Sequence, residues 1–261
     1  SVTDWSVSGH ASVMKKERKI IKLKSGYIFD GCNHITRDIG KDFYETFKDE
    51  LSQYDGFICC YPTEFCILYE LFEKPIIIVN CIRYEHPFTR YKTNWDELND
   101  VIENLKNKNL LHWVCNNKGD VEYTKFFTNI TGKWIPSLCE YTKSFYNPEK
   151  PHYLISNRTP LNSIILNNNA ISLSEIPKKG KWFSWKEKCK YKGVIHIPYH
   201  NGCMSIFEEY TSNIPLFLPS KSFGKKLFLK NYMFNDLTFY RYFKLKEPEN
   251  IENPNSLRNE K

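Results

Sequence analysis

The sequence predicts an α/β protein with two domains, each built around a parallel β-sheet. Short β-branched and apolar runs alternate with segments of helical periodicity along most of the 261 residues, as in strands that are connected by helices. The runs are almost continuously apolar, which is typical of parallel strands covered on both faces. A polar, tyrosine-rich stretch with prolines at 136, 148 and 151 interrupts the alternation. We therefore expect a hinge there, between domains at 1–143 and 144–261.

The first half is expected to alternate strands and helices from its first residue. Its helices carry apolar residues at about every fourth position, as at Ile39, Phe43 and Phe47. Because this half begins at a strand with no helix before it, we expect an incomplete N-terminal domain, with a first strand and helix missing or replaced. The expected strands are 1–5, 56–61, 76–79 and 110–115, and the expected helices are 39–54, 65–72 and 94–107.

The second half contains the most informative segment, 191–220, which predicts a strand, a glycine-containing loop, a helix and another strand. A helix N-terminus presents unpaired backbone N–H groups and the positive end of the helix dipole, and such a site binds phosphate. The segment therefore predicts a nucleotide diphosphate as ligand. The expected strands of this half are 152–155, 193–197 and 214–218, and the expected helices are 204–210 and 237–242, before a frayed tail from 247.

The composition is that of a globular protein that binds an anion. The formal net charge is +7, but the basic residues are scattered and no nucleic-acid-binding motif is found, so nucleic acid is a minor alternative. The aromatic residues are expected mainly in the core. The nine cysteines form no CxxC pair, which favours free thiols in a reducing compartment. No signal peptide or membrane-spanning run is recognised, so we expect a cytoplasmic protein of undetermined oligomeric state.

Several catalytic patterns are missing from the sequence. There is no HExxH metal motif and no DxD pair at the end of a strand. No P-loop and no GxSxG nucleophile turn is found either. We therefore expect neither a bound metal nor another cofactor, and no hydrolase or P-loop chemistry.

The stretch from Phe207 to Phe217, FEEYTSNIPLF, follows the loop and helix start described above. It contains an acidic residue, small polar residues and a proline before a strand. This order resembles the donor-binding segment of GT-B glycosyltransferases. The resemblance implies two Rossmann-like domains that face each other across a cleft. It also implies that Glu208 holds the ribose of a nucleotide sugar and that the helix start at 203–205 faces the diphosphate. His200 replaces a second acidic residue of the family, which leaves inversion or retention open.

The segments at 3–10, TDWSVSGH, and 80–88, NCIRYEHPF, are similar to glycosyltransferase-like proteins encoded by large DNA viruses and algae. A viral origin would place the protein in the host cytoplasm. Arg158 matches a position where the family often has a diphosphate-binding arginine, although a surface salt bridge is an alternative. Glu209 is an alternative to Glu208, and Ser205 could equally cap the helix. The expected donor-binding residues are Arg158, His196, Tyr199, His200, Asn201, Gly202, Cys203, Met204, Ser205 and Glu208.

The acceptor side is expected at the loops that follow the strands of the first half. Transfer of a sugar by direct displacement needs a base that takes the proton of the acceptor hydroxyl. His10 and Glu85 are favoured as this base, and Asp4 is a further catalytic candidate; Glu64 and His86 are also considered. Arg83, Tyr84 and Glu64 are the residues expected near the acceptor. The structural alternative is that Arg83 forms an ion pair with a glutamate that only fixes the loop.

These expectations lead to one main hypothesis for the function and two alternatives. The main hypothesis is a metal-independent glycosyltransferase that moves a sugar from a UDP- or GDP-linked donor to a hydroxyl of a glycan. The first alternative is a catalytically silent Rossmann-like module that binds a nucleotide or a glycan within a larger protein. The second is a basic protein associated with nucleic acid.

Overall fold

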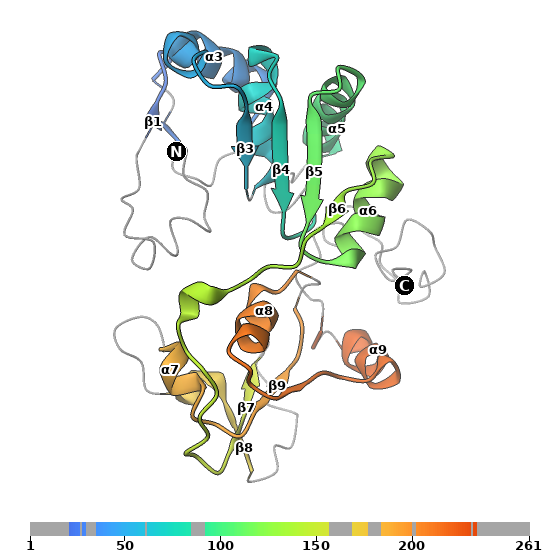
Figure 1. The fold of residues 1–261 in the computed structure, drawn as a ribbon. Coiled ribbons are helices and arrows are strands. Elements are labelled where there is room, and N and C mark those ends of the chain that lie inside the picture. Colours follow the sequence, from blue (N-terminus) through green and yellow to red (C-terminus); the bar gives the residue numbers. More distant parts are fainter. Residues whose placement is uncertain are drawn as a thin grey trace. The chain divides into compact units, whose positions relative to one another are not determined.

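A computed structural model describes residues 21–26, 28–29, 35–60, 62–84, 92–156, 169–176, 184–199, 202–230 and 232–233. Their contacts divide the chain into unit 1, with described residues from 21 to 135, and unit 2, with described residues from 136 to 233. Each unit contains a four-stranded parallel sheet with helices (Figure 1). The predicted α/β class and the parallel sheets are thereby confirmed. The segment 136–143, which the sequence placed in the first domain, belongs to unit 2.

The sheet of unit 1 has its strands side by side in the order in which they follow in the chain. The strands are β3 (Phe57–Cys59), β4 (Ile76–Asn80), β5 (Leu111–Cys115) and β6 (Lys133–Trp134). The helical elements are α3 (Arg37–Leu51), η1 (Thr63–Phe65), α4 (Cys66–Tyr69), η2 (Glu70–Phe72), α5 (Lys92–Asn107) and α6 (Lys118–Thr128). A separate antiparallel pair is formed by β1 (Ile21–Lys22) and β2 (Ile28–Phe29).

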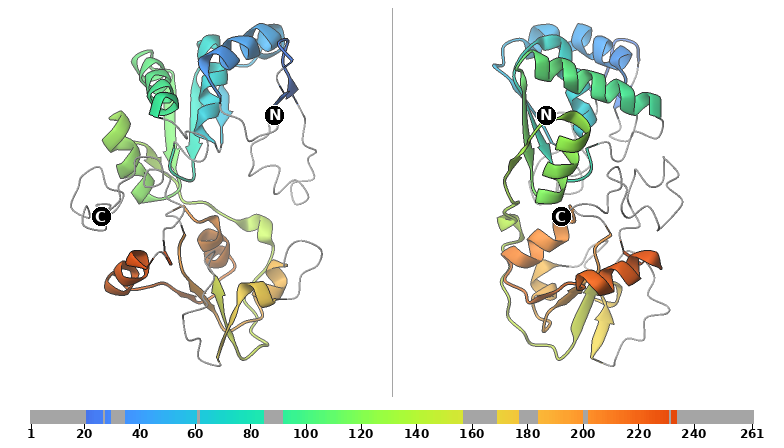
Figure 2. Two further views of the ribbon diagram at one scale, coloured as in Figure 1. Left: turned by 180° about the vertical axis from the view of Figure 1, so that it is seen from behind. Right: turned by 90° about the vertical axis from the view of Figure 1, so that its right-hand side faces the viewer.

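The helices of unit 1 lie on one side of this sheet (Figure 2). The successive strands of this sheet are added in one direction across it. Right-handed crossovers between such strands place every connecting helix on the same face of the sheet. The inner face is accordingly buried, as at Ile78 and Trp113, whereas Ile58 and Ile77 on the other face are 67% and 37% exposed. The expected cover on both faces is therefore not found for this sheet among the described residues.

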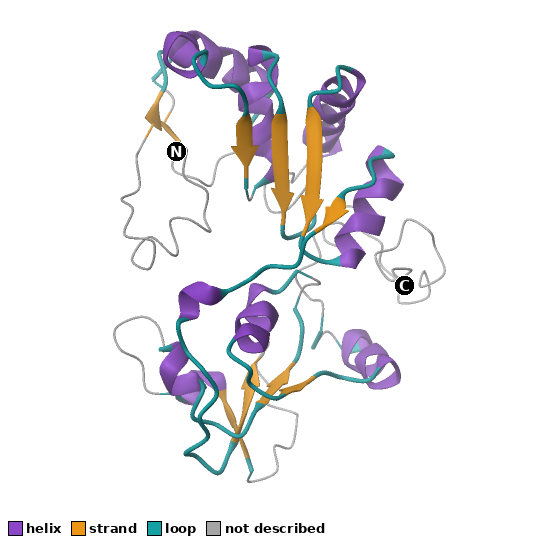
Figure 3. Ribbon diagram, viewed as in Figure 1, coloured by secondary structure: helices purple, strands orange, loops and turns teal. Residues whose placement is uncertain are grey.

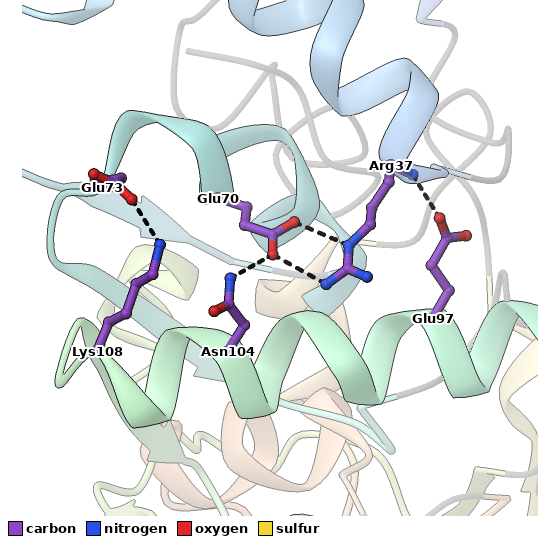
Figure 4. A network of polar contacts seen from close by, with 6 residues as sticks. All are labelled: Arg37, Glu70, Glu73, Glu97, Asn104 and Lys108. Atoms are coloured by element: carbon purple, nitrogen blue, oxygen red, sulfur yellow. Dashed lines mark hydrogen bonds and ion pairs between the residues drawn. The ribbon is translucent and has the colours of Figure 1, made fainter.

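A network of charged and polar side chains joins the helices of unit 1 (Figure 4). Glu70 accepts hydrogen bonds from Nε and Nη2 of Arg37 at 3.2 and 3.1 Å and from Nδ2 of Asn104 at 2.8 Å. Glu97 accepts from the backbone N–H of Arg37, at the first residue of α3, at 2.8 Å. A two-pronged arginine–carboxylate pair fixes orientation as well as distance. The network thus sets the position of the α3 N-terminus against η2 and α5.

The sheet of unit 2 has a different strand order, β10-β9-β7-β8 (Figure 3). The residues of one core lie on one face, with Leu154 and Val194, and those of a second core lie on the other face, with Ile155 and Leu227. This sheet is therefore packed on both sides. The strands are β7 (Tyr153–Ser156), β8 (Ala170–Ser172), β9 (Val194–His196) and β10 (Leu216–Phe217); the helical elements are η3 (Glu140–Thr142), η4 (Leu173–Glu175), α7 (Trp185–Lys188), α8 (Met204–Thr211) and α9 (Lys221–Leu229).

In both units a glycine directly precedes a strand and lies against the carbonyl of a proline. In unit 2 the N–H of Val194 donates to the carbonyl of Pro215 at 2.9 Å, and a Cβ at Gly193 would lie 2.8 Å from that oxygen. In unit 1 a Cβ at Gly56 would lie 2.7 Å from the carbonyl oxygen of Pro75. Only glycine allows the two backbones to approach so closely at these points.

We expect Gly193→Ala to destabilise unit 2 by about 1–3 kcal/mol, because the added methyl group has to displace backbone rather than a flexible side chain. Urea unfolding of both proteins, followed by far-UV circular dichroism, measures this difference. Gly224→Ala is the matched control, since the nearest atom to its added Cβ is the sulfur of Met233 at 3.3 Å and alanine favours a helix interior. Equal stability of Gly193→Ala and wild type would contradict the steric explanation.

Candidate functional site

The strand order of unit 2 reverses between β7 and β9. From β7 the chain moves to β8 on one side, and it then returns to β9 on the other side of β7. In an open parallel sheet, the loops after two such strands leave in opposite directions and form a crevice at the carboxyl ends. Ligands of such sheets bind at this crevice. The β9–α8 segment, which the sequence singles out for phosphate, starts from one of these two strands.

Three buried ionisable side chains hold β9, α7 and α8 together. Glu209 of α8 pairs with Nζ of Lys188 of α7 through Oε1 and with Nδ1 of His196 of β9 through Oε2, the latter at 3.0 Å. Each of the three is only 1% exposed. Burial by itself raises the pKa of Glu209, but the bond from His196 and the charge of Lys188 outweigh it, and the pKa lies below its ordinary value. Glu209 is therefore a buried carboxylate with two partners.

His196 combines this packing role with a position at the carboxyl end of β9, where the strand order reverses. It is the last residue of β9 and lies beside Ser156, the last residue of β7, in the register of the two strands. With Nδ1 donating to Glu209, Nε2 accepts a hydrogen bond when the ring is neutral and donates one when it is protonated. Nε2 is buried and has no hydrogen bond within the described residues. Buried polar atoms are nearly always paired, so Nε2 is suited to a ligand group.

The predicted donor-binding residues that the structure describes lie on the β9–α8 segment. Gly202 and Cys203 are buried, while Tyr199, Met204, Ser205 and Glu208 are partly exposed. Cys203 occupies the N-cap position of α8 and makes no side-chain capping bond. The segment thus brings His196 and the start of α8 into one stretch of chain. Arg158, His200 and Asn201 lie outside the described residues.

The two adjacent glutamates of α8 have different environments. Glu209 faces the core, whereas Glu208 is partly exposed and accepts a hydrogen bond from the hydroxyl of Tyr141 at 2.5 Å. Tyr141 lies in η3, in the segment that the sequence interpreted as a linker. The two carboxylates therefore differ in accessibility, since Glu208 is partly exposed and Glu209 is internal.

Arg83 and Tyr84, which the sequence placed near an acceptor, are both fully buried. Nη1 of Arg83 lies 2.5 Å from Oδ1 of Asp120. The hydroxyl of Tyr84 donates to Oδ1 of Asn99 at 2.8 Å and accepts from Nε1 of Trp95 at 2.7 Å. These contacts attach α5 and α6 to the carboxyl end of β4. The two side chains thus have a packing role in unit 1, and their burial does not support contact with an acceptor.

Glu64, the third residue expected near the acceptor, lies in η1 directly after β3 and is 2% exposed. Its Oε2 has no hydrogen bond within the described residues. Burial, with a smaller contribution from the charge of Glu97, raises the pKa of Glu64 well above its ordinary value. A carboxyl group with a raised pKa at the carboxyl edge of a parallel sheet is a candidate for proton transfer.

Asp4, His10, Glu85 and His86 lie outside the described residues, so the predictions for the catalytic base stay predictions. Sequence reasoning missed Tyr141 and Lys188. Tyr141 lies 67 residues from its partner Glu208, and no periodicity connects positions in a loop and a helix at that separation. The sequence does not distinguish Lys188 from exposed lysines. A lysine is expected at the surface unless it has a partner, and the sequence does not indicate the partner.

No family model, no curated protein and no solved structure matches the chain. Among the described residues, no group of three or more histidine, cysteine, aspartate or glutamate side chains is placed to hold a metal ion. Within the same part of the chain, the helices are too short or too polar to cross a lipid bilayer. The candidate site is therefore defined by the geometry of this chain and not by similarity to a known protein.

Glu209→Ala is expected to destabilise unit 2 by about 3–5 kcal/mol at pH 7, because it leaves the Lys188 ammonium buried without its counter-charge. Glu208→Ala, the neighbouring control, is expected to cost about 1 kcal/mol or less, since a partly exposed carboxylate is screened by water. Urea unfolding measures both.

The pH dependence gives a second measurement of the same interaction. A lowered pKa in the folded state stabilises the fold above the unfolded-state pKa of about 4.3, and this contribution is lost as the pH falls through the folded-state pKa. The difference between wild type and Glu209→Ala should therefore shrink in acid. A constant difference between pH 7 and pH 3 would contradict the assignment.

Glu64→Gln is expected to change the pH dependence of unit 1 in the opposite sense. With a raised pKa, folded Glu64 keeps a proton that the unfolded chain releases above a pH of about 4.3, so wild-type stability falls as the pH rises from there. Glutamine does not ionise. The melting temperature of Glu64→Gln relative to wild type should therefore rise between pH 4 and pH 8. Parallel curves for the two proteins over this range would show that Glu64 is ionised in the folded state.

Proposed function

We propose that the protein is a glycosyltransferase that moves a sugar from a nucleotide-diphosphate sugar to a hydroxyl group of a glycan. Unit 2 binds the donor and unit 1 binds the acceptor, in the two-domain arrangement of the GT-B enzymes that the donor segment resembles. The observation that carries the proposal is the reversal of strand order between β7 and β9. It supports a ligand crevice at the start of the segment that predicts phosphate binding.

The donor diphosphate is proposed to lie at the carboxyl end of β9 and the N-terminus of α8. The first N–H groups of this eight-residue helix and its dipole favour an anion. The buried Nε2 of His196 supplies a further hydrogen-bonding group at the same strand end. Because Nδ1 is engaged by Oε2 of Glu209, Nε2 donates to a phosphate oxygen when the ring carries a proton on both nitrogens. Glu208, on the next turn, accepts from hydroxyl groups of the ribose.

The reaction is a displacement at the anomeric carbon of the sugar. The acceptor oxygen forms a bond to this carbon while the bond to the phosphate oxygen breaks, and the nucleoside diphosphate leaves with the electron pair. The acceptor proton passes to a base, for which His10, Glu85 and Asp4 are the candidates. The helix dipole and His196 stabilise the charge that develops on the leaving diphosphate. Inversion and retention both stay open.

A nucleotide-binding module without catalytic activity is the second candidate. The burial of Arg83 and Tyr84 favours it, because two residues that were expected to contact the acceptor have packing roles instead. Both candidates share the donor site in unit 2. They differ in turnover, which requires an acceptor and a base.

Thermal unfolding in the presence of UDP, GDP or CMP tests the shared site. One diphosphate is expected to stabilise the protein, by about 2.7 kcal/mol at a concentration of 100 times its Kd. Glu208→Gln is expected to weaken this effect at unchanged stability without ligand. Glu149→Gln is the matched control, since Glu149 is an exposed residue of unit 2 that pairs with Lys190 at 3.1 Å.

Release of UDP or GDP from UDP- or GDP-sugars in the presence of glycans then separates the two candidates. Binding with release supports the transferase, and binding without release supports the silent module. The absence of any stabilisation by the three nucleotides would contradict both.

A further inference from the structure

The segment from Ser137 to Thr142 lies along one side of α8. Its partners on the helix, residues 204, 208 and 211, are spaced by four and three positions and therefore share one face. The contacts are Ser137 Oγ with Sδ of Met204 at 3.8 Å, Tyr141 OH with Oε1 of Glu208 at 2.5 Å, the N–H of Cys139 with Oγ1 of Thr211 at 3.3 Å, and Thr142 Oγ1 with Oγ of Ser212 at 3.4 Å. We call residues 137–142 the α8 strap.

Tyr141 makes the strongest of these contacts. Its ring packs edge-on against Trp185 of α7, with the ring centres 5.6 Å apart and the planes at 78°. Burial and the neighbouring Glu208 raise the pKa of Tyr141 well above its ordinary value, so the hydroxyl keeps its proton and is the donor. A short bond between a hydroxyl and a carboxylate is stronger than one between neutral groups. The direction of the Glu208 side chain is therefore set by Tyr141.

This bond engages one of the two carboxylate oxygens of Glu208. Oε1 accepts from Tyr141, and no second hydrogen bond of this carboxylate is found within the described residues. Glu208 is partly exposed, in contrast to the buried Glu209 beside it. A carboxylate has lone pairs for about four hydrogen bonds. Oε2 is thus left to accept from a ligand, and a diol is one neutral group that offers two adjacent donors.

We infer that Tyr141 is a positioning residue, which holds Glu208 so that its second oxygen accepts from the ribose hydroxyls of the donor nucleotide. The inference rests on the proposed function and adds a residue from outside the β9–α8 segment. A free glutamate samples several rotamers, and fixing one of them before the ligand arrives lowers the cost of binding. The Tyr141 hydroxyl therefore contributes to affinity without contacting the nucleotide.

Tyr141→Phe tests this role, because it removes the hydroxyl and keeps the ring against Trp185. Isothermal titration of wild type and variant with UDP and GDP, and with the 2′,3′-dideoxy forms of both, gives the affinities. We expect about fivefold to tenfold weaker binding of the ribonucleotide by Tyr141→Phe, as for the loss of one hydrogen bond to a charged group. Binding of the dideoxy form, which has no ribose diol, should be unchanged.

Two further proteins complete the experiment. Tyr141→Phe/Glu208→Gln should bind the ribonucleotide no more weakly than Glu208→Gln alone, because Tyr141 acts through Glu208. Ser137→Ala is the matched control, since it removes another contact of the α8 strap that does not involve Glu208. It should bind both forms like wild type.

The outcomes separate the inference from the proposed function. If wild type binds a ribonucleotide and Tyr141→Phe binds it equally well, Tyr141 does not position Glu208, while the donor site stands. If Tyr141→Phe weakens the ribo and dideoxy forms alike, Tyr141 has only a packing role and the inference is overturned. If wild type binds neither UDP nor GDP, the proposed function fails and this inference fails with it.

Discussion

The buried carboxylate of Glu209 is the contact on which the candidate donor site depends. Its two oxygens engage Lys188 and His196 and so connect α7, α8 and β9, a strand of only three residues. Apolar packing alone leaves so short a strand free to shift along its neighbours, whereas a paired charge in the interior has one low-energy arrangement. The start of α8 and the ring of His196 are both placed by this contact.

The parallel sheets of the two units differ in strand order and in the pairing of the polar groups at their strand ends. In unit 1 the strands succeed one another without reversal, and Arg83 and Tyr84 at the end of β4 are engaged by Asp120, Asn99 and Trp95. In unit 2 the order reverses, and the polar groups at the end of β9 include an atom with no partner in the described part of the chain. A binding crevice needs both a gap in the connections and polar groups that are not already paired.

The sequence predicts β3, β4, β5, α3 and α5 of unit 1 and β7, β9, β10 and α8 of unit 2, because their apolar patterns are strong or regular. It does not predict β6, α6, β8, α7 or α9. It does not predict which polar residues are buried. Arg83 and Tyr84 follow a strong strand and read as exposed loop residues, but partners far along the chain bury them. Glu208 and Glu209 lie on different faces of α8, one partly exposed and one buried, since a helix turns about 100° per residue. The sequence pattern gives no indication of the contact between Tyr141 and Glu208, because this contact joins an irregular segment to a helix.

The α8 strap also determines where the chain can be divided. A fragment that starts at residue 144, where the sequence places the second domain, lacks the side chains that cover Met204, Glu208 and Thr211. It would expose one face of α8 to water and release Glu208. A fragment that starts at Pro136, the first residue of unit 2 by its contacts, retains them. The segment that connects the units therefore belongs to unit 2. Its residues precede the sheet of unit 2 and contact α8.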